Sequence, residues 1–229
     1  MQCDRPPHFS KQQVTPSELA RVCRQNEAAT LSACDLQGMD MSGLAMAGWR
    51  FEKCNLTGAS FNGANLENAV FQGCRAPGSG FLSAMLTEAR IEGGDFSNCD
   101  FRGALFGEVK LSGCKMIGAD FSELCGNGFE IEECLMGLSL MPKLSFRKTT
   151  LRGVDFAEAD LRSCDFREAV FENCSLRDAN LADCRFQGAD LRGADLGGVT
   201  LGDAKRFKGA VISKGQAADL LSQLGLSVY

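Results

Sequence analysis

The sequence is poor in the residues that most enzyme active sites and metal sites require. Its 229 residues include a single histidine, His8, and the 12 cysteines form no C-x-x-C pair of the kind that binds zinc or exchanges disulfides. It has no phosphate-binding G-x-x-x-x-G-K-[ST] loop and no G-x-S-x-G nucleophile elbow. These absences argue against catalysis, a cofactor and a metal centre, and we expect none of the three.

Long apolar runs and an apolar leader are also missing. No stretch approaches the roughly 18 to 20 apolar residues that a membrane span needs. The first ten residues include Asp4, Arg5, Pro6 and Pro7, where a signal peptide would carry its apolar core. We therefore expect a cytoplasmic protein that does not contact a membrane, with His8 in a flexible leader and the cysteines kept as reduced thiols.

Positive charge is scarce in the middle of the chain. The net charge is −5, but residues 31–205 hold 17 Lys and Arg against 25 Asp and Glu, so the ends are basic and the body is acidic. The segment 116–142 has no Lys or Arg at all and is the most acidic part. Because affinity for nucleic acid comes largely from Lys and Arg, direct binding to nucleic acid is not expected, and a basic partner is favoured.

The dominant pattern is a large apolar residue at every fifth position from Leu31 to Leu201. Of these 35 positions only Ala76 and Gly126 are not large and apolar. Two residues earlier the chain carries Ala or another small residue, and nine of the 12 cysteines fall there; two residues later it carries Gly in 16 repeats. A period of five fits neither an α-helix at 3.6 nor a β-strand at 2.

A square coil explains this period if each pentapeptide forms one side and four complete a turn of 20 residues. We call the large apolar position i. Positions i and i−2 then both point inward, since residues two apart in an extended segment share a face. Gly at i+2 suits a type II turn, which needs a positive φ there. Cysteines that are 20 residues apart, such as Cys54 and Cys74, should stack in one interior column as small apolar side chains. The predicted fold class is all-β, a quadrilateral β-helix.

The two ends predict capping helices. Thr15 and Glu18 form a capping box around Pro16, so a helix over 16–27 should follow. Ser213 and Gln216 form a second box before a helix over 214–224, which Gly225 ends. The predicted regions are a leader and capping helix at 1–28, the repeat β-helix at 29–205 and a C-terminal capping or dimerisation helix at 206–229.

Two stretches depart from the repeat. Gly126 removes an inward side chain, and Phe129 is too large for an ordinary i−2 site, so the two are expected to compensate. Leu135, Leu138 and Leu140 fall at i−1 and i+2, which normally face water. They form either an exposed interaction site or a local distortion that turns them inward, and the sequence leaves both open.

Repeats such as Ala64-Asn65-Leu66 and Ala159-Asp160-Leu161 have the A-[D/N]-L-x-x pattern of the pentapeptide repeat family, and the resemblance covers about three-quarters of the chain. The final run, Q-A-x-x-L-L-x-x-L-G-L from Gln216, resembles the Qnr quinolone-resistance group and, more loosely, its relative MfpA. The resemblance implies a right-handed β-helix and a homodimer paired through the C-terminus. It also implies an acidic surface that imitates DNA, binds DNA gyrase or topoisomerase IV and protects the enzyme from quinolones or other poisons. The alternative is a scaffold rod with an unrelated protein partner.

The candidate site residues fall into three sets. Carboxylates of the middle coils are expected to bind the partner: Glu88, Glu92, Glu108, Asp120, Glu123, Glu130, Glu132 and Glu133. Candidate loop contacts lie where 75–80 or 123–128 could bulge from the coil: Arg75, Ser79 and Asn127. The expected dimer contacts are Leu220, Leu221, Leu224, Leu226, Val228 and Tyr229.

Charge is also expected to follow the coils. One i+1 column has a glutamate at every second coil, roughly 10 Å apart: Glu52, Glu92, Glu132 and Glu172. Six arginines of the later coils should dilute this acidic field: Arg147, Arg152, Arg162, Arg167, Arg177 and Arg192.

Overall fold

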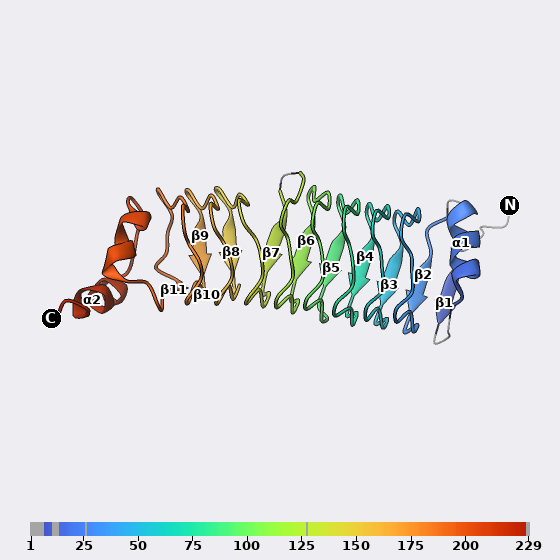
Figure 1. The fold of residues 1–229 in the computed structure, drawn as a ribbon, viewed down its shortest axis with the longest axis horizontal. Coiled ribbons are helices and arrows are strands. Elements are labelled where there is room, and N and C mark those ends of the chain that lie inside the picture. The colour runs from blue at the N-terminus through green and yellow to red at the C-terminus, as the bar shows by residue number, and fades with distance from the viewer. Residues whose placement is uncertain (1–6, 11–13, 26, 127, 228–229) are drawn as a thin grey trace. The chain divides into compact units, whose positions relative to one another are not determined.

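The computed structural model describes residues 7–10, 14–25, 27–126 and 128–227. It comprises two compact units, unit 1 (Met1–Glu130) and unit 2 (Ile131–Tyr229). Both consist of right-handed quadrilateral β-helix built from the five-residue repeat, so the predicted fold class is confirmed (Figure 1).

Unit 1 stacks its coils through short parallel strands. These pair in chain order, each with the next: β1 (His8–Ser10), β2 (Thr30–Ser32), β3 (Arg50–Glu52), β4 (Val70–Gln72), β5 (Arg90–Glu92) and β6 (Lys110–Ser112). From β2 onward each residue pairs with the residue 20 positions later, as Phe51 does with Phe71. The other three sides of the coil make parallel bridges with the same separation. Four pentapeptides per turn are therefore confirmed.

Every coil is lined by the predicted inward residues. In unit 1 the rings of Phe61, Phe81, Phe101 and Phe121 stack one above the next, with centroids 4.8 to 5.0 Å apart. All nine i−2 cysteines are buried, and the thiols of most donate to a carbonyl of the preceding coil; Cys54, for example, bonds to the Leu31 oxygen at 3.2 Å. No disulfide joins two of the described cysteines. The structural role predicted for them is confirmed.

The corners show that the i+2 position needs a positive φ more than it needs glycine. Glycines such as Gly58 and Gly63 adopt φ near +64°, as predicted for type II turns. Eighteen non-glycine residues at the same repeat position also have positive φ, between 52° and 63°. For a residue with a Cβ this conformation costs roughly 1 kcal/mol, which the buried side chains at i and i−2 offset.

Unit 2 continues the same architecture and then departs from it. β7 (Glu130–Glu132) begins with the last residue of unit 1 and pairs with β8 (Thr150–Arg152), which pairs with β9 (Val170–Glu172); β10 (Cys174–Ser175) pairs with β11 (Ala194–Asp195). The repeat was predicted to continue as coil through Leu201, and the prediction is wrong for the last repeat. A 3-10 helix, η1 (Leu201–Phe207), replaces the coil, which resumes where Val211 bridges Asp190.

The N-terminal end is more ordered than predicted. His8 was expected in a flexible leader, but it starts β1, which pairs with the first coil through β2 and completes that edge. Helix α1 (Pro16–Gln25) ends two residues before the predicted Glu27 and buries Leu19 and Val22. Its capping box is confirmed, since Thr15 N donates to Glu18 Oε2 at 2.8 Å.

Helix α2 (Lys214–Ser222) follows its predicted capping box, with Gln216 N donating to Ser213 Oγ at 3.2 Å. It ends two residues before the predicted Leu224, and Gly225 then adopts φ +74°. The Gln216 side chain also donates to two carbonyls of the last coil, at 2.8 and 2.7 Å, which fixes α2 on that coil. No helix in the described part of the chain is both long and apolar enough to cross a membrane.

Candidate protein-interaction surface

Four of the eight predicted partner-binding carboxylates gather around one side of unit 1. We call the side formed by β2–β6 the strand side. Glu88 and Glu108 occupy i+2 of successive coils at the corner where the chain enters this side. Glu92 ends β5, and Glu130 begins β7, with its backbone N donating to the Val109 oxygen. All except the half-buried Glu92 are exposed.

Cations are interleaved with these carboxylates. Lys110 Nζ lies 2.9 Å from Glu130 Oε2, which neutralises that pair, while Glu88, Glu92 and Glu108 form no ion pair with a described residue. A surface hollow of about 330 Å³ lies between the corner residues and the first strand residues of three successive coils. It is lined by Asn68, Val70, Glu88, Arg90, Glu108 and Lys110. The strand side is therefore acidic at its edges and mixed in charge along its middle.

Two of the predicted carboxylates lie elsewhere on unit 1. Asp120 bridges Asp100 on the side opposite the strand side, two sides further round the coil, and Glu123 follows at the next corner. Arg102 pairs with Asp100 at 2.7 Å and lies 3.8 Å from Asp120, so this side is partly neutralised. One flat partner surface cannot cover both sets.

The glutamate column behaves differently in the two units. In unit 1 the aligned residues are Glu52, Gln72, Glu92 and Ser112, so acids alternate with neutral residues as predicted. In unit 2 the column reads Glu132, Arg152, Glu172 and Arg192, and Arg152 Nε donates to Glu172 Oε2 at 2.8 Å. Glu132 and its neighbour Glu133 are exposed. The acidic character of this column therefore belongs to unit 1 and the start of unit 2.

All six arginines predicted to dilute the acidic field are engaged in ion pairs. Their partners are Glu168, Glu172, Asp160, Asp165, Asp195 and Asp190, in the order of the arginines along the chain. Each arginine therefore cancels one carboxylate of unit 2 and does not add a free cation to its surface.

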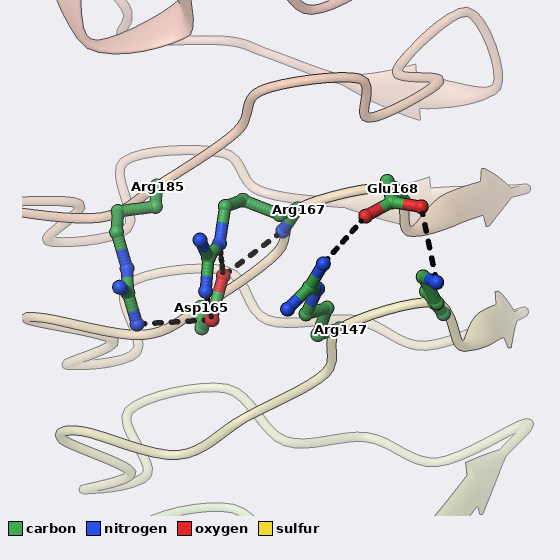
Figure 2. Close-up of polar contacts among 6 residues, drawn as sticks. Arg147, Asp165, Arg167, Glu168 and Arg185 are labelled. Carbon is green, nitrogen blue, oxygen red and sulfur yellow. Dashed lines mark hydrogen bonds and ion pairs between the residues drawn. The ribbon is translucent and has the colours of Figure 1, made fainter.

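Figure 2 shows the densest of these networks. Asp165, whose relative exposure is only 6%, accepts bonds from Arg167 at 2.8 and 2.7 Å and from Arg185 at 2.9 Å. The hydrogen bonds from Arg167 hold the pKa of the Asp165 carboxyl below its usual value. Beside it, Glu168 pairs with Arg147 at 3.0 Å and with Lys148 at 3.6 Å. This face of unit 2 is densely charged, and each of its two carboxylates is shared by two cations.

The first predicted bulge is absent. Residues 75–80 keep the coil geometry, with Arg75 bridging both neighbouring coils and Gly78 at φ +68°. Arg75 is exposed, but Ser79 was a candidate loop contact and is fully buried, because its hydroxyl donates to the Leu56 oxygen at 2.6 Å. The placement of Ser79 at a surface is therefore wrong.

The second predicted bulge is present. Cys125 still bridges Leu105, and Gly126 is exposed with φ +95°. Figure 1 shows a loop before β7 that stands out from the neighbouring corners of the coil. Asn127 lies outside the described residues. The Phe129 ring packs 5.9 Å from Phe106, the residue on which a large side chain at 126 would have stacked. The expected compensation between Gly126 and Phe129 is confirmed.

The structure decides the orientation of the three leucines. Leu135, Leu138 and Leu140 are exposed by 47%, 56% and 42%, so they face solvent and are not turned inward. Unit 1 has a second set that the sequence analysis missed, Leu82, Met85 and Leu105, although their positions at i+1 and i−1 would have indicated exposure.

The predicted dimer residues divide into two groups. Leu220 and Leu221 are half-buried on α2, while Leu224 and Leu226 beyond the helix are exposed. Val228 and Tyr229 lie outside the described residues. Among the described residues, no three His, Cys, Asp or Glu side chains converge closely enough to hold a metal ion.

The five-residue coil and its repeats identify the class: the chain is a pentapeptide repeat protein. A family model described as "Pentapeptide repeat region" matches residues 45–121, and one described as "Pentapeptide repeats (8 copies)" matches 141–167 and 164–203. No curated protein sequence matches the chain significantly.

Among solved structures, the chain is similar to full-length QnrB1, "a plasmid-mediated fluoroquinolone resistance protein". The identity is 23% and the TM-score 0.58, covering 86% of this chain and 100% of QnrB1. A trypsin-treated QnrB1 variant matches with 22% identity and a TM-score of 0.53 over 88% of this chain and 99% of the other. These similarities show the fold that this chain shares with QnrB1.

Proposed function

We propose that this protein binds a type II topoisomerase, DNA gyrase or topoisomerase IV, by presenting carboxylates where the enzyme would hold DNA, and that binding alters the enzyme's response to quinolones or other poisons. The observation that carries the proposal is the set of strand-side carboxylates of unit 1 that form no ion pair with a described residue, Glu88, Glu92 and Glu108. The protein acts as a ligand rather than a catalyst, in the cytoplasm where DNA is handled.

The physical basis is electrostatic complementarity with a DNA-binding surface. A DNA-binding protein lines its site with Lys and Arg to meet phosphates. Carboxylates held on a stiff coil at multiples of the rung spacing, about 4.8 Å, offer such a site fixed negative charge without the conformational freedom of a flexible acidic tail. Association should be fast and sensitive to salt, since exposed charges are screened over about 8 Å at physiological ionic strength.

The similarity to QnrB1 supports the fold on which the proposal depends, and the C-terminal run from Gln216 to Leu226 adds a resemblance at the dimer end. We propose that two copies pair there, because Leu224 and Leu226 remain exposed after α2 has packed on the last coil. Sedimentation of the wild type should give a dimer, and Leu224→Glu combined with Leu226→Glu a monomer. A monomeric wild type at micromolar concentration would contradict this pairing.

Two matched variants test which side of unit 1 binds. The first neutralises the strand side with Glu88→Gln, Glu92→Gln and Glu108→Gln. The second is the control on the opposite side, Asp120→Asn with Glu123→Gln. Affinity for purified gyrase, measured by biolayer interferometry at two salt concentrations, should fall at least about tenfold for the first variant and change little for the second. Equal affinities for wild type and strand-side variant would refute the site, and no binding of the wild type at micromolar concentration would refute the proposal.

A further inference from the structure

The most unusual surface feature of unit 2 is an apolar corner of its first coil. Leu135 and Leu140 stand at i−1 on two adjacent sides, and Leu138 occupies the corner between them, all three more than 40% exposed. We call Leu135, Leu138 and Leu140 the leucine corner. Positions i−1 and i+2 carry mainly polar residues or glycine elsewhere in the chain, so three leucines at one corner are an exception to the repeat.

The backbone at Leu138 adopts a conformation that disfavours leucine. Its φ is +58°, a conformation in which the Cβ of an L-residue crowds its own backbone and which favours Gly or Asn. Of the 18 described non-glycine residues with positive φ, Leu138 is the only large apolar one; the others are polar, charged or alanine. Leu138 thus has a disfavoured backbone conformation, and its side chain faces water. A residue that breaks two local rules at once is typical of a site that serves binding.

Unpaired carboxylates border the leucine corner on the next coil. Asp155 bridges Leu135, and Glu158 lies one coil beyond Leu138 at the same corner. Within the described part of the chain, neither carboxylate forms an ion pair, in contrast to Asp160, which pairs with Arg162 at 2.7 Å. An apolar centre with uncompensated negative charge at its rim is complementary to an apolar surface rimmed by cations.

We infer that the leucine corner is a docking site for a protein partner that presents aliphatic or aromatic side chains flanked by Lys or Arg. The leucines enter the partner's apolar surface, and Asp155 and Glu158 meet its cations at the rim. This site goes beyond the proposed topoisomerase contact: it lies on unit 2, it depends on apolar burial, and it does not need the strand-side carboxylates of unit 1.

The probe is a phage library of random disulfide-cyclised dodecapeptides, selected on the immobilised wild-type protein. Counter-selection uses Leu138→Asn, which replaces the apolar side chain with that of asparagine, a residue that tolerates positive φ. The enriched peptides should combine aliphatic or aromatic residues with Lys or Arg. Their affinities, measured by fluorescence anisotropy on synthetic peptides, should fall about tenfold for Leu138→Asn and severalfold for Asp155→Asn with Glu158→Gln, the second loss shrinking in high salt.

The matched control is Leu82→Asn, an exposed leucine of unit 1, which should leave peptide affinity unchanged. Thermal denaturation should show Leu138→Asn at least as stable as the wild type, so lost binding would not reflect lost fold. Enrichment of acidic peptides, equal binding to wild type and Leu138→Asn, or no enrichment at all would overturn the inference. Self-association of the wild type that Leu138→Asn abolishes would also overturn it, since a second copy would then occupy the corner. Loss of gyrase binding in the strand-side variant leaves this result unaffected.

Discussion

The buried carboxylate of Asp165 gives a quantitative test of how charge stabilises unit 2. Asp165→Asn keeps the side-chain shape and removes the charge that Arg167 and Arg185 share. Breaking a buried ion pair costs about 3 to 5 kcal/mol when the remaining charge stays buried. Here the two arginine side chains are 32% and 53% exposed, so they can rehydrate, and we expect a smaller loss of about 2 kcal/mol in the free energy of unfolding.

The matched control is Asp155→Asn. In both aspartates Oδ1 accepts a backbone N–H two residues later, from Arg167 at 3.2 Å and from Ala157 at 3.0 Å, and an asparagine oxygen can replace it. Asp155 has no arginine partner among the described residues. Its substitution should therefore change the free energy of unfolding by no more than about 0.5 kcal/mol. Urea denaturation of both variants against the wild type gives the comparison.

The pH dependence identifies the charge as the cause. Because the pKa of Asp165 is lowered in the folded state, its contribution is present above the unfolded pKa, near 4, and is lost as pH falls through the lower folded pKa. The wild type should exceed Asp165→Asn by the full amount at pH 6, and the difference should shrink below about pH 4. A difference that persists unchanged at pH 3, or a loss equal to that of Asp155→Asn, would refute the reasoning.

Two further pairs test the coil geometry by chemical denaturation. Gly94→Ala should lower the free energy of unfolding by about 3 kcal/mol, because the new Cβ would meet the backbone of the preceding coil. Gly93→Ala, whose Cβ would have no atom within 4 Å, should lower it by about 1 kcal/mol because of its positive φ alone. Equal losses would contradict the close packing of coils at Gly94. Ser139 is fully buried, and its hydroxyl has no hydrogen-bond partner among the described residues, so Ser139→Ala should stabilise the protein by about 1 kcal/mol. Ser79→Ala should destabilise it by a similar amount. A loss for both serines would show that the Ser139 hydroxyl is satisfied.

The coil and its caps could be predicted because one physical constraint repeats along the chain. The large residue of each repeat from Leu31 onward must point inward. Because the same requirement recurs in every repeat, a single exception such as Ala76 does not hide the period. The capping boxes at Thr15 and Ser213 could also be predicted from the sequence, since each is formed by side chains only three residues apart. Features that occur once were not predictable in this way: β1 depends on pairing with the first coil, and η1 on how the last coil closes.

The candidate surface was only partly predictable for a different reason. Charge along the sequence does not show which side of the coil a residue occupies, so the sequence alone indicates a single acidic region over 116–142. The structure separates Asp120 from Glu130 by two sides and pairs Glu130 with Lys110. The exposure of Leu138 could not be decided from the sequence, because its apolar character favoured an inward position and its place in the repeat an outward one.

The proposed function is tested most directly by supercoiling with purified DNA gyrase, titrated with this protein in the presence and absence of a fluoroquinolone. If the protein occupies the DNA-binding surface of the enzyme, micromolar amounts should restore supercoiling in the presence of the drug, and the strand-side variant should require at least about tenfold more protein. Supercoiling that the protein leaves unchanged, both with and without the drug, would contradict the proposal.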